Sequence, residues 1–199
     1  MERLVGSFLR DEMLASVPLH PNQHADQAGK FMETALHRLV VQVEKALDQQ
    51  ETALGVFLDK EGHLITPHMT PCVLLFLNMG LITPSYGEIR ATLEDHLAAA
   101  TLGGLSKRIM VSRGCPQGGV LSPLLWCLVV DDLIARLNGG GIYTQGYADD
   151  ICLPVVGIFL NTVLGLIQWA LHTVETWCDK VGMSVNTEKN QAHCIHKER

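Results

Sequence analysis

Two apolar runs flank the four residues Tyr147 to Asp150, and this pattern constrains the fold more than any other feature of the 199-residue chain. Residues 142–146 and 151–156 have strand character, and the residues between them are turn-prone. We therefore predict a hairpin with two adjacent carboxylates at its turn. Strand alternation directs neighbouring side chains to opposite sides, whereas a turn lets both approach one point. A plain hairpin turn, in which Asp is common, is the alternative.

Helical and strand patterns alternate along the rest of the chain. Apolar spacing predicts amphipathic helices over 34–48 and 161–181, and a Ser-Pro start predicts another over 123–138. The short apolar runs 53–58 and 108–112 favour strands. A mixture of helices and strands in this order indicates an α+β fold.

Composition excludes several classes of protein. Hydrophobic residues make up 47% of the chain and charged residues 18%, which excludes an intrinsically disordered chain. The net charge of −6 excludes a general polyanion binder, so any contact with nucleic acid has to be local. The stretch from Ile151 to Val174 lacks acidic residues, Lys and Arg and is long enough to span a bilayer. Pro154 and Gly157 favour a strand, a loop and a helix instead, and a small membrane protein stays the weaker alternative.

Six cysteines are scattered through apolar stretches without any CxxC pair. In a chain of this size they indicate reduced, buried thiols rather than a disulfide framework. The charged N-terminus does not have the pattern of a signal peptide. We therefore expect an intracellular, reducing compartment, and the sequence does not distinguish nucleus from cytoplasm.

A second acid, Asp59, ends the apolar run 53–58. If it met Asp149, two carboxylates about 4 Å apart would repel by about 4 kcal/mol at an effective dielectric of 20. Hard divalent cations with oxygen ligands supply the missing counter-charge. A simple strand-end carboxylate is the alternative for Asp59 alone.

The segment from Arg113 to Pro123 combines glycine, proline and glutamine before the predicted helix 123–138. Glycines permit close approach of a ligand to the backbone, and the Gln117 amide both donates and accepts hydrogen bonds. The alternative is a structural loop before a helix, the usual explanation for such a cluster.

The three segments, in this order, resemble the palm of a reverse transcriptase, and the likeness is closest to non-LTR (LINE-type, jockey-like) retrotransposons. The motifs that carry it are RGCPQGGVLSPLLW at 113–126 and GYADD at 146–150. The resemblance implies a polymerase palm: a split βαβ antiparallel sheet with the helices 123–138 and 161–181 on one face, plus partial fingers. We expect fingers in residues 1–50 and palm in 51–199, with 60–88 divergent and no thumb or endonuclease.

The resemblance also implies an activity, that of an RNA-directed DNA polymerase. Asp59, Asp149 and Asp150 would hold two Mg²⁺ ions for attack of a DNA primer 3′-hydroxyl on a deoxynucleoside triphosphate, with RNA as the template. Lys189 matches a family lysine, and a lysine there can protonate the departing pyrophosphate. A solvated surface lysine is the alternative.

Five further positions correspond to nucleotide- or template-binding residues of the family. Tyr147 would lie near the primer end, and Gln117 and Gly118 would lie against the incoming nucleotide and the template. Lys30, in a segment that resembles the fingers motif, would meet the triphosphate as a point charge. Leu64 occupies the position of the aromatic residue that screens the sugar 2′-hydroxyl, and it is smaller.

Two readings of the activity stay open: an active polymerase domain, and a catalytically inactive retrotransposon remnant acting at most as a binding or structural module. Likeness to the family nearly vanishes from 60 to about 88 and then returns. This loss and recovery suggests a pair of compensating frameshifts.

We expect structural roles for three further groups: a solvated acidic pair, a helical tryptophan core and a frayed C-terminal tail. Their members are Asp131 and Asp132, then Trp126, Trp169 and Trp177, and finally His193, Cys194 and His196. For the acidic pair, a buried acid that supports the catalytic strands is the alternative.

Overall fold

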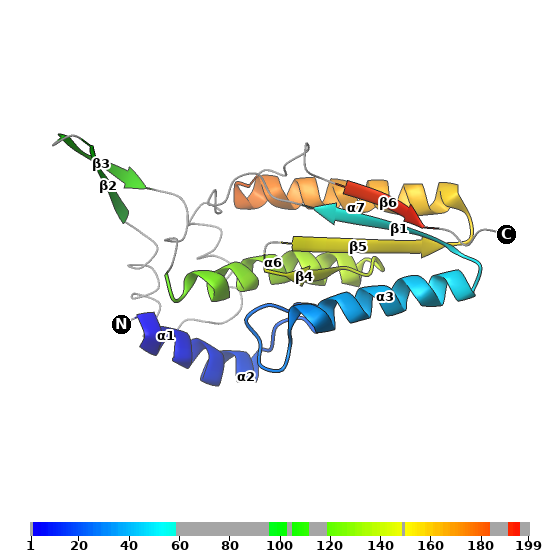
Figure 1. The fold of residues 1–199 in the computed structure, drawn as a ribbon, viewed down its shortest axis with the longest axis horizontal. Helices are drawn as coiled ribbons and strands as arrows, with labels where there is room; N and C mark the ends of the chain where they lie inside the picture. The colour runs from blue at the N-terminus through cyan, green and yellow to red at the C-terminus, as the bar shows by residue number, and fades with distance from the viewer. Residues whose placement is uncertain are drawn as a thin grey trace. The chain divides into compact units, whose positions relative to one another are not determined.

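The computed structural model describes residues 2–58, 96–102, 105–111, 119–148, 150–183 and 191–195 (Figure 1). The chain divides into two compact units, each discontinuous in sequence. The first comprises Met1–Pro18, His63–Leu125 and Lys180–Met183, and the second comprises Leu19–Gly62, Trp126–Asp179 and Ser184–Arg199. The assignment of fingers to 1–50 and palm to 51–199 stays a prediction.

A four-stranded antiparallel sheet forms the centre of the second unit. Its strands, in the spatial order β4-β5-β1-β6, are β4 (Gln145–Tyr147), β5 (Asp150–Gly157), β1 (Thr52–Leu58) and β6 (Gln191–Ile195). The pairing of β1 with β5 runs from Thr52↔Gly157 to Leu58↔Ile151. The predicted hairpin and the predicted strand 53–58 are therefore confirmed. Strand β4 is shorter than the predicted run 142–146, because 142–144 have no regular structure.

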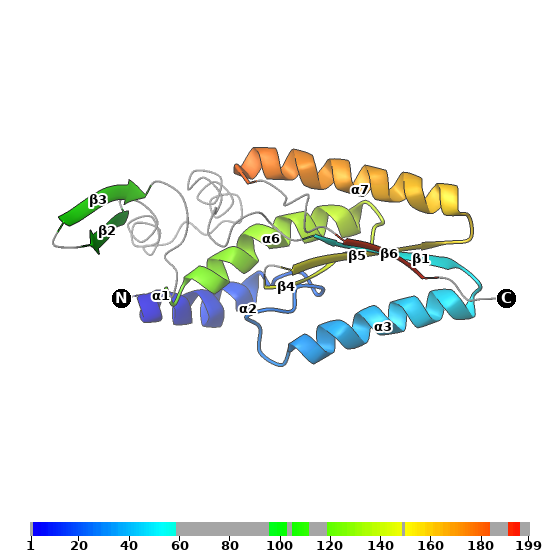
Figure 2. The same cartoon turned by 45° about the horizontal axis from the view of Figure 1, so that its top comes forward.

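Helices lie on both faces of this sheet. They are α3 (Met32–Asp48), α6 (Ser122–Gly139) and α7 (Leu160–Val181), and parts of the last two belong to the first unit. Figures 1 and 2 show α6 and α7 along one face, as the sequence predicts, and α3 along the other. Residues 151–155 of β5 are buried in succession, which requires cover on both faces of the strand.

Glycines end the two helices that follow the predicted motifs. Gly141 has a φ of 85° and follows the end of α6, where Ile142 N–H donates to Leu137 O at 2.9 Å and Gly141 N–H donates to Asn138 O at 3.0 Å. This pair of bonds is a Schellman motif, which favours glycine at the left-handed position. Gly182, with a φ of 71°, is also left-handed and follows the end of α7.

The first unit contains elements that local patterns did not predict. Short helical segments cover its N-terminal part, namely α1 (Glu2–Phe8), η1 (Leu9–Met13) and α2 (Leu14–Ser16). A two-stranded hairpin pairs β2 (His96–Leu102) with β3 (Leu105–Val111). Only the second of these strands was expected, over 108–112.

The prediction of a frayed C-terminal tail is wrong for His193 and Cys194. Both belong to β6, which pairs with β1 from Ala53↔Ile195 to Phe57↔Gln191. Strand β6 has only five residues and all of its side chains are exposed, so its apolar pattern is too short to predict this edge strand. The ring of His193 lies edge-on to that of Phe57, with 6.1 Å between centroids. His196 lies outside the described residues.

The tryptophan core is confirmed only in part. Trp177 is buried and Trp126 is half-buried, whereas Trp169 is 45% exposed, so its assignment to the core is wrong. The Trp169 ring packs instead over Gly140, where a Cβ would collide with it. The absence of a side chain at Gly140 therefore lets the Trp169 indole pack against the backbone that follows α6.

None of the described helices is long and apolar enough to cross a membrane. The uncharged stretch from Ile151 to Val174 divides between β5 and α7. The alternation of strand, loop and helix that its glycine and proline indicated is confirmed.

Candidate active site

The β4–β5 hairpin carries the predicted carboxylate turn. Tyr147 and Asp150 form its last pair, and Ala148 between them has a φ of 51°. A positive φ is uncommon for a residue with a Cβ but matches the twist of a tight hairpin. Tyr147 is half-buried and Asp150 is exposed, while Asp149 lies outside the described residues. The turn therefore brings Tyr147 and Asp150 together at the end of the hairpin.

Strands β4 and β1 end, and strand β5 begins, at the same level beside this turn. Ile151 of β5 pairs with Gly146 on one side and with Leu58 on the other. Leu58 is the last residue of β1, and Asp59 follows it in the sequence. The register thus directs the end of β1 to the carboxylate turn.

Six of the predicted site residues lie outside the described part of the chain: Asp59, Leu64, Gln117, Gly118, Asp149 and Lys189. Within the described part, no three His, Cys, Asp or Glu side chains gather as a metal site would require. The predicted roles of these residues stay predictions.

An extended segment before α3 closes the outer edge of β4. Gln23 forms a parallel bridge with Gly146, in which His24 N–H donates to Gly146 O at 2.8 Å and Gly146 N–H donates to Asn22 O at 3.0 Å. Gln23 and His24 are fully buried, and Gln23 Nε2 and His24 Nε2 have no hydrogen-bond partner. The β4 backbone next to Tyr147 is therefore hydrogen-bonded along both edges, to β5 and to the segment around Gln23.

Lys30 holds this same segment together. Its Nζ donates to Pro21 O at 2.8 Å and to Gln23 O at 2.7 Å, which uses two of its three donors. Burial lowers the pKa of Lys30, and the nearby charge of Arg38 lowers it further. The structure gives Lys30 a role in shaping the loop, and contact with a triphosphate stays a prediction.

A cleft of about 370 Å³ opens at the start of α3. The residues around it are mostly basic or polar: His24, Gly29, Lys30, Glu33, Thr34, His37 and Arg38. Burial, followed by the charges of Lys30 and Arg38, lowers the pKa of His24. The sequence did not predict this cleft, because Lys30 was the only one of its residues that a motif singled out.

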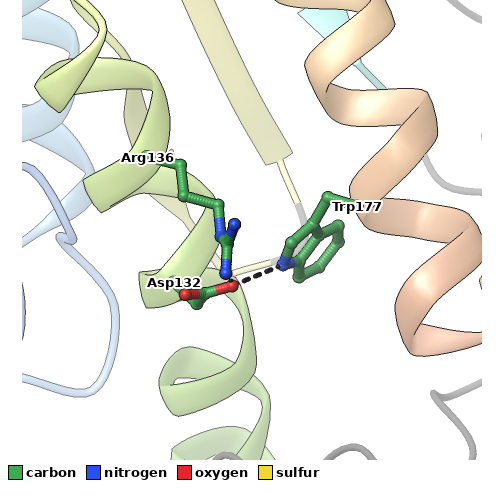
Figure 3. A network of polar contacts seen from close by, with 3 residues as sticks. All are labelled: Asp132, Arg136 and Trp177. Carbon is green, nitrogen blue, oxygen red and sulfur yellow. Dashed lines mark hydrogen bonds and ion pairs between the residues drawn. The ribbon is translucent and has the colours of Figure 1, made fainter.

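The acidic pair on α6 is partly buried, so its assignment to a solvated face is wrong. Asp132 Oδ2 accepts from Arg136 Nε at 2.7 Å and from Trp177 Nε1 at 3.1 Å (Figure 3). Asp131 Oδ1 accepts from the backbone N–H of His20 at 2.7 Å. Both acids therefore join α6 to other segments, which periodicity alone does not indicate.

Asp131 makes stability depend on pH. Burial raises its pKa from 3.8 to about 6, and the hydrogen bond from His20 offsets part of this rise. A raised pKa in the folded state stabilises the fold at low pH, and this contribution is lost as pH rises through about 6. Asp131→Asn keeps an acceptor for His20 and removes the charge. We expect it to raise the free energy of unfolding at pH 8 by about 1 to 2 kcal/mol, since the partial exposure of Asp131 moderates the effect.

Urea unfolding at pH 5 and pH 8 checks this expectation, with Asp132→Asn as the matched control. Asp132→Asn weakens an ion pair and is expected to lower stability at pH 8. An equal effect of Asp131→Asn at both pH values would contradict the assignment.

Four cysteines lie within the described residues, and none of them forms a disulfide. Cys127, Cys152 and Cys178 are buried as predicted, whereas Cys194 is exposed. Burial raises the pKa of Cys152 to about 12 and, together with nearby acids, that of Cys178 to about 11. These two thiols are therefore unreactive.

The arrangement of strands and helices is similar to that of a known polymerase. The apo telomerase of Candida tropicalis matches with a TM-score of 0.68 and 11% sequence identity, over 99% of this chain and 36% of that chain. At this identity the likeness shows the fold alone. The fold is a polymerase palm-type α+β fold, as the sequence predicts.

Sequence comparison defines the family. A family model described as reverse transcriptase (RNA-dependent DNA polymerase) matches residues 79–199. The chain therefore belongs to the reverse transcriptase family.

Two Drosophila melanogaster relatives agree with this assignment. A probable RNA-directed DNA polymerase from transposon X-element is 27% identical over all of this chain and 22% of its own length. A putative 115 kDa protein in the type-1 retrotransposable element R1DM is 36% identical over 84% of this chain and 16% of its own length. The LINE-type resemblance is confirmed, and the chain spans about a fifth of the length of these relatives.

Proposed function

We propose that this chain is the catalytic palm segment of an RNA-directed DNA polymerase from a non-LTR retrotransposon. The observation that carries the proposal is the register Gly146–Ile151–Leu58. Paired residues of antiparallel strands have Cα atoms about 4.5 to 5.5 Å apart. Asp59 is the residue after Leu58, and Asp149 lies two residues before Ile151. Both acids are thus within two residues of a single strand pair.

The donor set fits a hard divalent cation. Asp59, Asp149 and Asp150 offer carboxylate oxygens, which Mg²⁺ prefers when it also binds substrate phosphates. Reverse transcriptases are in general metal-dependent, and we propose two Mg²⁺ ions for this site. When bound, such ions neutralise charge on the attacking and leaving oxygens of a phosphoryl transfer. The carboxylates would fix the ions, and the hairpin would hold the carboxylates.

The remaining predicted residues complete the proposal. Tyr147, half-buried beside the turn, would support the primer end, and Gln117 and Gly118 would border the incoming nucleotide and the template. Leu64 would contact the sugar in place of an aromatic side chain. Lys189 would protonate the departing pyrophosphate.

The partners proposed are an RNA template, a DNA primer and deoxynucleoside triphosphates. Lys30 retains one donor beyond its two backbone carbonyls, and that donor is available to a phosphate. For the compartment, we propose an intracellular, reducing one, which the buried thiols of Cys127, Cys152 and Cys178 favour.

RNA-templated primer extension tests the proposal. The purified chain is incubated with a labelled DNA primer on an RNA template, the four deoxynucleoside triphosphates and Mg²⁺, and a parallel sample receives EDTA. We expect extension by nucleotides complementary to the template, and none with EDTA. Absence of extension under all conditions would favour the inactive remnant.

A further inference from the structure

The carbonyl of the carboxylate turn is bound by a tryptophan from another element. Trp126 Nε1–H donates to Ala148 O at 2.7 Å, a short distance for a bond of this kind. The two residues are 22 positions apart in the sequence, and Trp126 belongs to α6. The indole therefore reaches the turn from outside the hairpin.

Ala148 is a residue for which such support matters. Its φ of 51° lies in the left-handed region, which residues with a Cβ rarely adopt. Asp149, the predicted metal ligand, follows directly in the sequence. A peptide group that rotated at Ala148 would redirect the chain that enters Asp149.

The helix that carries Trp126 is firmly packed. Beyond Trp126, one face of α6 is fully buried: Val130, Leu133, Ile134 and Leu137 are each 0% exposed. Trp126 itself is half-buried, so its indole bond is partly shielded from water. A donor fixed on such a helix holds an acceptor more firmly than one on a loop.

We propose that Trp126 is a positioning residue that fixes the left-handed turn at Ala148 and thereby orients the carboxylates of the polymerase site. The inference rests on the proposed function for its catalytic meaning. The fixing of the turn itself is independent of any activity.

Two changes at Trp126 remove the donor. Trp126→Phe removes it with some loss of volume. Incorporation of 3-benzothienylalanine at the same position replaces the indole N–H by sulfur and keeps the ring system, so folding is preserved. Trp177→Phe is the matched control, since Trp177 Nε1 donates to Asp132 Oδ2 at 3.1 Å, away from the turn.

Three measurements on the full chain separate positioning from folding: the thermal midpoint, hydrogen exchange of the peptide covering 145–152, and Mn²⁺ binding by electron paramagnetic resonance. With the donor removed, we expect exchange in this peptide to rise about fivefold, the factor that one hydrogen bond contributes. We expect Mn²⁺ affinity to fall while the benzothienyl variant keeps its thermal midpoint. Trp177→Phe should leave both exchange in this peptide and Mn²⁺ affinity unchanged.

Unchanged exchange in 145–152 after removal of the donor would overturn the proposal. So would an equal rise in Trp177→Phe, because it would show general loosening. If the wild-type chain binds no Mn²⁺, the proposed polymerase site fails, and the exchange result still decides whether Trp126 fixes the turn.

Discussion

Asp149→Asn is expected to lower the rate of RNA-templated primer extension by about a thousandfold or more. The change removes the negative charge that would hold a divalent cation and leaves a weaker neutral ligand of nearly the same shape. Single-turnover extension of a labelled primer at saturating Mg²⁺ measures the effect on the chemical step.

Asp179→Asn provides the control for this experiment. Asp179 is an exposed acid on α7 and is not among the residues of the proposed site. We expect the Asp179→Asn variant to extend primers within a few-fold of the wild-type rate. Extension by Asp149→Asn at the wild-type rate would exclude this turn as the site of catalysis.

Gly146→Ala is expected to lower the free energy of unfolding by about 1 to 3 kcal/mol. A Cβ at Gly146 would lie 2.8 Å from Ile134 Cδ1 and 3.4 Å from Gln23 Oε1. Ile134 is 0% exposed, and the close packing of protein interiors resists the movement of its side chain. Urea unfolding followed by circular dichroism measures the loss.

Three further variants make this prediction specific. Ile134→Val removes the colliding Cδ1 and by itself costs about 0.5 to 1.5 kcal/mol. The double variant should therefore lose less than the sum of the two single changes. Gly165→Ala, in α7, meets no atom within 4 Å and should gain about 0.5 to 1 kcal/mol from helix propensity. Additive losses at 146 and 134 would contradict the close packing of β4 on α6.

Local patterns predicted the elements that build the site. Alternation and turn chemistry identified the hairpin, because apolar runs on both sides of 147–150 leave a strand pair as the simplest solution. Apolar spacing and the Ser-Pro start placed the helices, and glycines in the left-handed region, Gly141 and Gly182, follow the ends of α6 and α7. Family motifs, rather than periodicity, supplied the expected roles of the acids.

Contacts between distant segments account for what was missed. The hydrogen bond that Asp131 accepts comes from the backbone of His20, 111 positions away, and no window of sequence contains both. Strand β6 has an exposed pattern and is ordered by pairing with β1. The bond from Trp126 to Ala148 joins a residue assigned to helix packing with one assigned to a turn.

Binding of Mn²⁺ to the wild-type chain, Asp59→Asn, Asp149→Asn and the double variant tests the central claim most directly. If both acids hold the same ions, either single change abolishes most of the binding, and the second change adds little. Electron paramagnetic resonance titration should therefore give strongly non-additive losses. Losses of Mn²⁺ affinity that add independently, or affinities that neither change alters, would contradict a metal site shared by Asp59 and Asp149.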